Sequence, residues 1–326
     1  MKFGKSSNLT VIKKYYIVNI SMNSFMKDKY CIFNVVGGIG KHIAATAVAK
    51  CIKNNYPDRK LIVVCVYNEI FINLSYIDRV YQLGNTNYFY QNYIQDKDSL
   101  IFHHEPYYTT DHIHKKLPLI ENWCKLYNLN FNNEKPDLKF NNLQKNISKN
   151  VWCKGKKPIM VIHTNGGMMT TDAKPYSWTR DMPEDLAQRI INHYKDKYHI
   201  YQITKLNSSK LNNATHIFAT PEQSLSLMEL FSILIHSKKR VLIDSCMQHA
   251  AAALRLPSTV LWNGTSPKVF GYEMHDNICT SIPYNFKLPG SYLFDFDFNG
   301  NEVEYPFCEQ EELFDFDTII QSIDKQ

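Results

Sequence analysis

The apolar positions in the first half of the chain predict a strand, a helix and a second strand in succession. Residues 31–36 form a short apolar run, which two glycines interrupt at once. Residues 41–54 are alanine-rich with apolar residues near one helical face, and residues 61–66 form a second apolar run. A continuous apolar strand is typical of a parallel sheet that is buried on both faces. We therefore predict a βαβ unit, followed by short strands at 78–83 and 100–103.

The same succession begins again after a polar segment. Residues 128–158 are rich in Asn, Lys and Pro, and we expect them to lie between two domains. The later pattern predicts strands at 158–163, 198–203, 240–243 and 258–262, alternating with helices at 183–194, 224–236 and 248–254. Alternation of this kind predicts an α/β fold. We expect two Rossmann-like, doubly wound domains, 1–150 and 151–326, facing a central cleft.

Composition and charge narrow the class of protein. With 44% hydrophobic residues among 326, the chain has enough apolar side chains for buried cores, which excludes a disordered protein. It has no apolar run of about 20 residues and no evident signal peptide, so we expect a cytoplasmic protein without a transmembrane segment. The eight cysteines form no CxxC pair, which indicates reduced thiols. A net charge of +6, spread along the chain, suits an anionic ligand.

The segment 241–267 carries the most specific pattern of candidate chemistry. Asp244 ends a buried strand and a helix begins directly after it, so the unpaired N–H groups and the dipole of that helix form an anion site. His249 lies one turn into the helix, within reach of the same ligand. The polar loop 263–267 follows the next strand, where open α/β sheets bind ligands. The alternative is that Asp244 only caps the helix and His249 packs in the core.

At this point the chain resembles a known family. Residues 244–253 have the sequence Asp-Ser-x-x-x-His-Ala-Ala-Ala-Ala, preceded by SLMELFSILIHSKKRVLI and followed by LWNGTSP. This resembles the donor-binding half of the ADP-heptose:lipopolysaccharide heptosyltransferases, which are family nine of the GT-B glycosyltransferases. The glycine turn, HIAATAVAKCIKNNYP and YIDRVYQL of the first half resemble the same family, so the resemblance covers most of residues 31–275. It implies a GT-B fold, in which a last helix at 313–323 crosses back to the first domain.

The resemblance also implies the residues of the donor side. Asp244 matches the acidic residue that hydrogen-bonds the donor sugar, and the helix start offers backbone N–H groups to the diphosphate. Arg180 is the nearest match to the basic residue that neutralises the leaving diphosphate, with Lys174 as its substitute. The donor-binding residues implied in this way are Asp244, Ser245, Cys246, Met247, His249, Thr265, Ser266 and Lys174.

On the acceptor side, the resemblance implies a catalytic aspartate directly after the turn of Gly38 and Gly40. Lys41 stands there in this chain, and His42 is next. A protonated lysine cannot accept a proton from an attacking hydroxyl, whereas the ordinary pKa of histidine suits that task. We expect Lys41, His42 and Arg180 to be the catalytic residues, with His42 as the base. An unidentified carboxylate as base, and a packing role for His42, are the alternatives.

A cluster of histidines and acids at 103–105 and 111–114 suggests a metal at first sight. Its mixed spacing argues against a closed site, and the resemblance implies catalysis by helix dipoles and basic side chains. We therefore expect no metal and no cofactor. His104 and Glu105 are expected to contact the acceptor.

The resemblance implies a glycosyltransferase of the hexosyl or heptosyl transfer class. It would move a sugar from a nucleotide-diphosphate sugar to a glycan or lipid-linked acceptor such as lipopolysaccharide, with inversion and without a metal. Three alternatives stay open: a phage-type enzyme acting on hydroxylated DNA bases, a non-catalytic sugar-nucleotide-binding protein, and an epimerase. DNA is not favoured as a partner, because no concentrated basic groove is evident.

Overall fold

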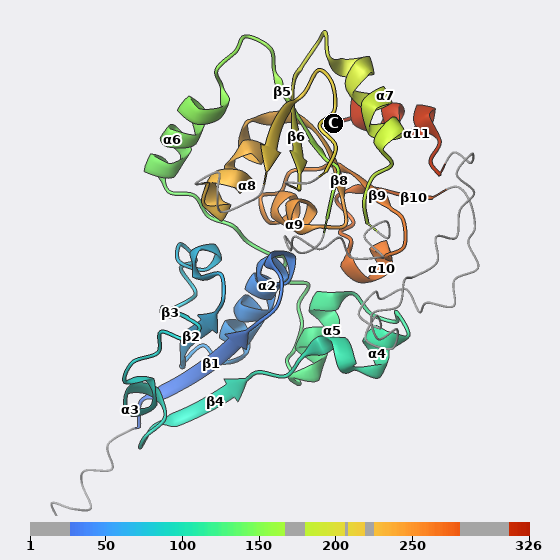
Figure 1. Cartoon of the computed structure of the whole chain (residues 1–326). Coiled ribbons are helices and arrows are strands. Elements are labelled where there is room, and N and C mark those ends of the chain that lie inside the picture. Colours follow the sequence, from blue (N-terminus) through green and yellow to red (C-terminus); the bar gives the residue numbers. More distant parts are fainter. Residues whose placement is uncertain (1–26, 167–179, 206–207, 219–224, 281–312) are drawn as a thin grey trace, which may run out of the picture.

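The computed structural model describes residues 27–166, 180–205, 208–218, 225–280 and 313–326. In these residues the chain forms two parallel β-sheets with helices packed against them (Figure 1). This confirms the predicted α/β class and both successions of strands and helices. That the two halves are separate domains facing a cleft stays a prediction.

The first sheet has four strands in the order β3-β2-β1-β4. Its elements are β1 (Lys29–Val35), α2 (Ile39–Asn55), β2 (Lys60–Cys65), η1 (Asn68–Ile70), β3 (Arg79–Gln82), α3 (Phe89–Tyr93), β4 (Asp98–Phe102), η2 (Pro106–Tyr108), α4 (Thr110–Ile113) and α5 (Leu119–Leu126). Because side chains alternate along a strand, Phe33 and Val63 face the core that contains α2, while Ile32 and Ile62 face α3.

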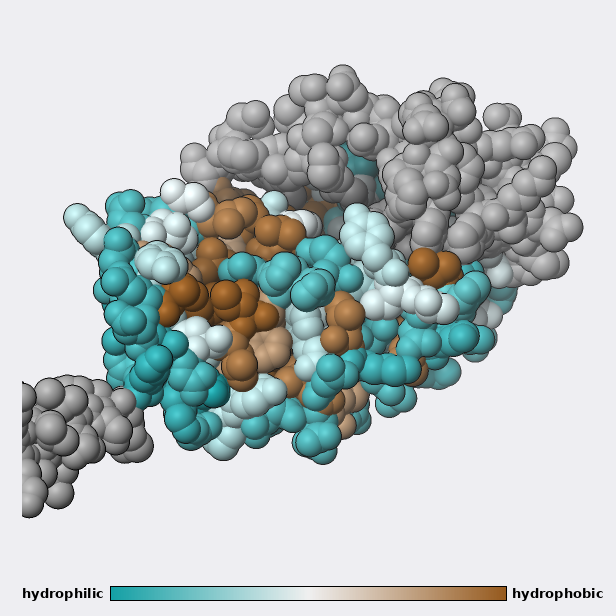
Figure 2. Space-filling view, turned by 90° about the horizontal axis from the view of Figure 1, so that it is seen from below, coloured by the Kyte–Doolittle hydropathy of each residue, from teal (hydrophilic) through white to brown (hydrophobic). Residues whose placement is uncertain are grey.

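The short helix α3 leaves part of that second face uncovered. Ile101 pairs with Ile32 across β1 and β4, and its side chain is 51% exposed. Viewed from below, the first half shows apolar side chains gathered among polar ones (Figure 2).

The second sheet has six strands in the order β10-β9-β8-β5-β6-β7. Its strands are β5 (Ile159–His163), β6 (His199–Thr204), β7 (Thr215–Phe218), β8 (Ser237–Ile243), β9 (Thr259–Trp262) and β10 (Asp276–Cys279). Its helices are α6 (Asn142–Trp152), α7 (Glu184–Tyr194), α8 (Leu227–His236), α9 (Cys246–Ala253), α10 (Pro267–Phe270) and α11 (Phe316–Asp324). One core joins this sheet to α7 and α11, and another joins it to α6, α8 and α9, so helices cover both faces.

Two features differ from the sequence predictions. Helix α6 lies inside the segment expected to connect the domains, and it packs on α8 through a hydrogen bond of 2.8 Å from Trp152 Nε1 to Ser232 Oγ. Leu143 and Ile147 of this helix are exposed, so it buries few apolar side chains. A capping box formed by Asn141 and Gln144 stabilises its start.

The last helix also differs from its prediction. In the described residues α11 does not cross back to the first half but packs on the second sheet beside α7 (Figure 1). Its Ile319 and Ile323 are fully buried there, and the Tyr194 hydroxyl donates to Asp324 Oδ1 at 2.8 Å. The apolar face of α11 is buried against the second sheet and α7.

The two halves meet where α2 packs on α9 (Figure 1). Both helices are alanine-rich, and their buried residues belong to one continuous apolar core. Small side chains let the helix axes approach closely. A Cβ atom on Gly40 would lie 2.6 Å from His249 Cδ2 and 3.6 Å from Cys246 Cα, so the start of α2 lies directly against the start of α9.

This contact gives a test of the junction. Gly40→Ala places a methyl group against the buried His249 ring, and we expect it to lower the free energy of unfolding by about 1–3 kcal/mol. Urea denaturation measures this. Gly38→Ala is the matched control, because nothing lies within 4 Å of its Cβ position and its φ of −75° suits alanine. Equal stability of the two variants would contradict the close packing.

Candidate functional site

The loops at the carboxyl ends of β5, β8 and β9 form the half of the candidate site that belongs to the second sheet. Asp244 directly follows β8, and Asn263 directly follows β9. Asn263 Nδ2 donates to the Asp181 carbonyl at 2.7 Å, and the Gly166 N–H donates to Asp181 Oδ1 at 2.8 Å. Asp181 therefore ties these loops together, a role that the sequence analysis missed although the residue adjoins Arg180.

Asp244 is the buried acid of this half. Its side chain is 5% exposed, and its Oδ2 lies 3.8 Å from Arg180 Nε. Burial raises the pKa of Asp244, while the Arg180 charge and the Thr265 hydroxyl oppose that shift. Asp244 Oδ2 and Thr265 Oγ1 are both buried, and neither has a hydrogen-bond partner in the part of the chain that the structure describes. Leaving such atoms unpaired is costly, so their position favours a ligand that brings hydroxyl groups.

The start of α9 lies next to this acid. Ser245 is the N-cap in an extended conformation, and its side chain makes no capping hydrogen bond. Met247 is fully buried and can offer only its backbone, while Cys246 is partly exposed. Burial raises the pKa of the Cys246 thiol to about 11, so it stays protonated at neutral pH. The helix start therefore suits an anion through its backbone.

His249 has the packing role that the sequence analysis gave as the alternative. Its Nδ1 lies 2.8 Å from the Tyr272 hydroxyl, and the ring is buried against Gly40. Burial lowers the pKa of His249 to about 3, so the ring is neutral.

Lys41 and Glu105 form the first-half side of the site. They make an ion pair in which the Lys41 side chain is 4% exposed and that of Glu105 is 27% exposed. The Lys41 ammonium lies 5.1 Å from the ring centroid of Tyr107 and 5.2 Å from that of Trp123. Burial lowers the pKa of Lys41, and Glu105 opposes this shift. The pair is thus anchored at its lysine end and open at its carboxylate end.

His42 is positioned differently from its prediction. The residue is 0% exposed, its Nδ1 lies 2.9 Å from the Gly38 carbonyl oxygen, and the Val66 N–H donates to its Nε2 at 3.3 Å. Burial lowers the pKa of His42 to about 4. A ring with both nitrogens engaged by the backbone has none left for a substrate. This geometry favours a structural role that joins the glycine turn to the end of β2.

The two half-sites lie close together across the junction. Gly40 contacts the start of α9, and its neighbour Lys41 reaches Glu105. Glu105, Arg180 and Asp244 all act electrostatically on the buried hydroxyl of Tyr107, whose pKa is raised mainly by burial.

Not every predicted residue joins this group. The His104 ring is exposed and stacks on His103 with a centroid distance of 4.4 Å. Ser266 is the partly exposed N-cap of α10. Lys174 lies outside the described residues.

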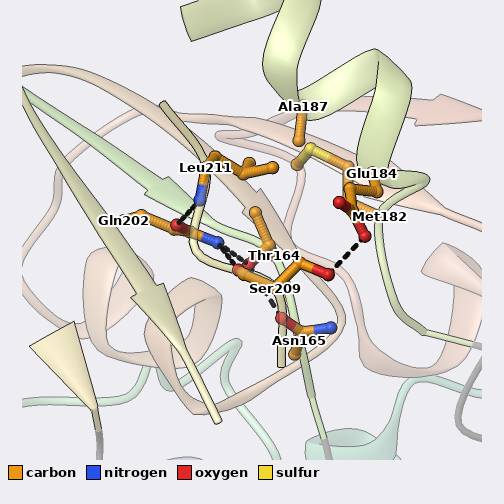
Figure 3. A pocket seen from close by; sticks show the side chains of 8 residues that line it. All are labelled: Thr164, Asn165, Met182, Glu184, Ala187, Gln202, Ser209 and Leu211. Carbon is orange, nitrogen blue, oxygen red and sulfur yellow. Dashed lines mark hydrogen bonds between the residues drawn. The ribbon is translucent and has the colours of Figure 1, made fainter. Parts of the chain in front are cut away.

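A small pocket lies beside the site, between β5, β6 and the start of α7 (Figure 3). Gln202 Nε2 donates to Thr164 Oγ1 at 3.1 Å and to the Ser209 carbonyl at 3.0 Å, and the Leu211 N–H donates to Gln202 Oε1 at 3.0 Å. These hydrogen bonds of the Gln202 side chain hold Ser209 and Leu211 against the sheet.

Among the described residues, no group of three or more His, Cys, Asp or Glu side chains could hold a metal ion. No helix in this part of the chain is long and apolar enough to cross a membrane.

Comparison by sequence gives no relative: no family model and no curated protein matches the chain. Comparison by structure gives clear ones. The chain is similar to a glycosyl transferase family 9 protein from Veillonella parvula, with a TM-score of 0.64 and 11% identity over 93% of this chain and 98% of that one. The chain has the fold of these glycosyltransferases.

Two other solved structures agree. ADP-heptose lps heptosyltransferase II of E. coli has a TM-score of 0.58 and 10% identity over 80% of this chain and 92% of that one. The iron-containing dodecameric glycosyltransferase TibC of enterotoxigenic E. coli has a TM-score of 0.60 and 13% identity over 92% of this chain and 77% of that one. The shared fold extends over both sheets.

The buried histidines predict acid sensitivity. Burial lowers the pKa to about 4 in His42, His112, His163 and His275, and to about 3 in His249. In the unfolded chain they titrate near about 6.5, so the unfolded state binds protons first as the pH falls. The contribution of these histidines to the free energy of unfolding is fully present above about pH 6.5. It is lost as the pH falls from there to about 4, by up to about 2 kcal/mol per histidine at pH 5.

Urea denaturation at pH 7 and pH 5 measures this loss. His42→Asn should reduce the pH slope of the free energy of unfolding by one proton, which is about 1.4 kcal/mol per pH unit. His193→Asn is the control, because His193 is exposed on α7. A His42→Asn slope equal to that of the wild type would contradict the assignment of His42 as buried and neutral.

Proposed function

We propose that the protein transfers a sugar from a nucleotide-diphosphate sugar to the hydroxyl group of an acceptor. The observation that carries this proposal is Asp244 at the start of α9, a buried carboxylate whose Oδ2 lies 3.8 Å from Arg180 Nε and has no hydrogen-bond partner among the described residues. One ligand that satisfies all three features has hydroxyl groups beside a diphosphate. The fold shared with glycosyltransferases supports the same ligand class.

In this proposal the donor lies at the carboxyl ends of the second sheet. Asp244 accepts hydrogen bonds from the sugar hydroxyls, Thr265 and Ser266 lie near the phosphates, and the backbone at Ser245, Cys246 and Met247 binds the diphosphate. The Arg180 guanidinium neutralises charge on the departing nucleotide diphosphate, which lowers the barrier without a metal. Lys174 is its proposed partner in that task.

The acceptor lies against the first half, near Gly38, Gly40 and Glu105. Its hydroxyl oxygen attacks the anomeric carbon from the face opposite the leaving group, so the sugar is inverted. We propose a heptosyltransferase-like donor and a glycan or lipid-linked acceptor. E. coli neighbours described as ADP-heptose lps heptosyltransferases support this choice.

A donor panel tests the proposal directly. ADP-heptose, ADP-glucose, GDP-mannose and UDP-glucose are each added to the protein, and the thermal unfolding midpoint and nucleotide release are measured. We expect one donor to raise the midpoint and to release its nucleotide. Stabilisation without release, with lipopolysaccharide core fragments as acceptors, would indicate a non-catalytic binding protein. No response to any donor would contradict the proposed function.

A substitution tests the placement of the donor. Asp244→Asn removes the negative charge of the carboxylate that accepts hydrogen bonds from the donor sugar. Because hydrogen bonds to a charged group are lost, we expect donor binding to weaken 10- to 100-fold in Kd, about 1.5–3 kcal/mol. Isothermal titration with the stabilising donor measures it. Asp276→Asn is the control, because Asp276 is exposed at the start of β10. An unchanged Kd for Asp244→Asn would move the donor site elsewhere.

A further inference from the structure

The proposed transfer requires a group that accepts the proton of the acceptor hydroxyl. We infer that Glu105 is this catalytic base and that Lys41 is a positioning residue that holds it at the junction of the two halves. The inference rests on the proposed function and adds to it the identity of the base.

Glu105 is accessible to a substrate. A base must reach the substrate hydroxyl within hydrogen-bond distance. The Glu105 side chain is 27% exposed, whereas that of its partner Lys41 is 4% exposed. One carboxylate oxygen accepts from Lys41, and no described residue donates to the other. A carboxylate fixed at one oxygen and open at the other has the geometry of a general base.

The second argument is that the other described candidates around the junction are committed elsewhere. Both nitrogens of His42 are engaged by the backbone, and its ring is 0% exposed. Asp181 Oδ1 accepts from the Gly166 N–H at 2.8 Å and Oδ2 from Asn165 Nδ2 at 3.2 Å. The side chain of Asp244 is 5% exposed and faces Arg180.

The third argument is position. Gly40 lies against Cys246 Cα at the start of α9, and Lys41 follows it in sequence. The Lys41 side chain lies over Gly37, where a Cβ atom would be 3.2 Å from Lys41 Cδ, and ends between the rings of Tyr107 and Trp123. Gly37 has a φ of +97°, so this approach depends on glycine. The packing leaves the ammonium only a small range of positions, and the ion pair fixes Glu105 in turn.

In the proposed sugar transfer, the acceptor oxygen forms a bond to the anomeric carbon, and the bond between that carbon and the diphosphate oxygen breaks. The electron pair of the broken bond leaves with the nucleotide diphosphate, toward Arg180. The proton of the acceptor hydroxyl passes to the Glu105 carboxylate. No oxidant, reductant or further co-reactant takes part.

Glu105→Gln is the decisive variant, because glutamine keeps the size and one acceptor oxygen for Lys41. With the donor that the wild type turns over, we expect kcat to fall about 10²- to 10⁴-fold while the donor-induced thermal shift is retained. Asp111→Asn is the matched control: Asp111 is paired with Lys125 at 2.6 Å in α4 and is not part of the site. Its kcat should stay within two-fold of the wild type.

Lys41→Met tests the positioning role. The charged group paired with Glu105 is the Lys41 ammonium on α2. The charges of Glu105, Arg180 and Asp244 all affect the pKa of the buried Tyr107 hydroxyl. Loss of the ammonium removes the nearest positive charge, so we expect the acid limb of the kcat profile to shift to higher pH while the donor KM is unchanged. A merely structural role for Lys41 would lower stability and leave the pH profile in place.

The outcomes separate the two proposals. A wild type that neither binds nor turns over any donor overturns the proposed function, and the base with it. An active wild type with Glu105→Gln within two-fold of its kcat overturns the base alone. If Glu105→Gln does not fold, the double variant Lys41→Met/Glu105→Gln replaces it, because it removes the buried charge together with its partner. The double variant should be folded, bind donor and be inactive, and turnover by it would overturn the inference.

Discussion

The close packing of α2 on α9 is the contact on which the candidate site depends. It brings two alanine-rich helices together at their starts, and it leaves no room for a side chain at Gly40. Each helix begins directly after a parallel strand, so the contact sets the carboxyl ends of the two sheets against each other. Both helix starts carry partial positive charge, which favours anionic groups between them. Without this contact, Asp244 and Glu105 would belong to two unrelated surfaces.

The charges at this junction are costly to the fold. Lys41 and Asp244 are nearly fully buried, and they form ion pairs with Glu105 and Arg180 respectively. Removing such ions from water costs more than many of their pairings return, so buried pairs are weak evidence of stability. Two pairs of this kind at adjacent strand ends are better explained by the chemistry proposed for the site. In the proposed mechanism, Lys41 anchors Glu105 in the first half, whereas Asp244 and Arg180 of the second half both act on the donor.

Local pattern was sufficient for most of the elements but not for all. The buried strands β1, β2 and β5 and the helices α2 and α7 have strong periodicity, and they were predicted to within about three residues. Strands β7 and β10 were missed, although the equally short β3 and β9 were predicted. The predicted strand began at Arg240, whereas β8 begins at Ser237, so its first three residues were missed. Lys239 in this missed part is buried, and its ammonium donates to the Ile323 carbonyl at the end of α11, at 2.6 Å.

The sequence by itself determined the α/β class and the position of Asp244 at the start of a helix, because these depend on neighbours along the chain. It also showed that Lys41 stands where the family resemblance implies an acid. Only the tertiary structure decided that His42 is enclosed by backbone groups, that His249 packs on Tyr272 and that Glu105 reaches Lys41. Glu105 lies 64 residues from Lys41, so no local pattern could pair them. Burial and long-range contact fix the protonation and reach of a side chain, and both exist only in the folded chain.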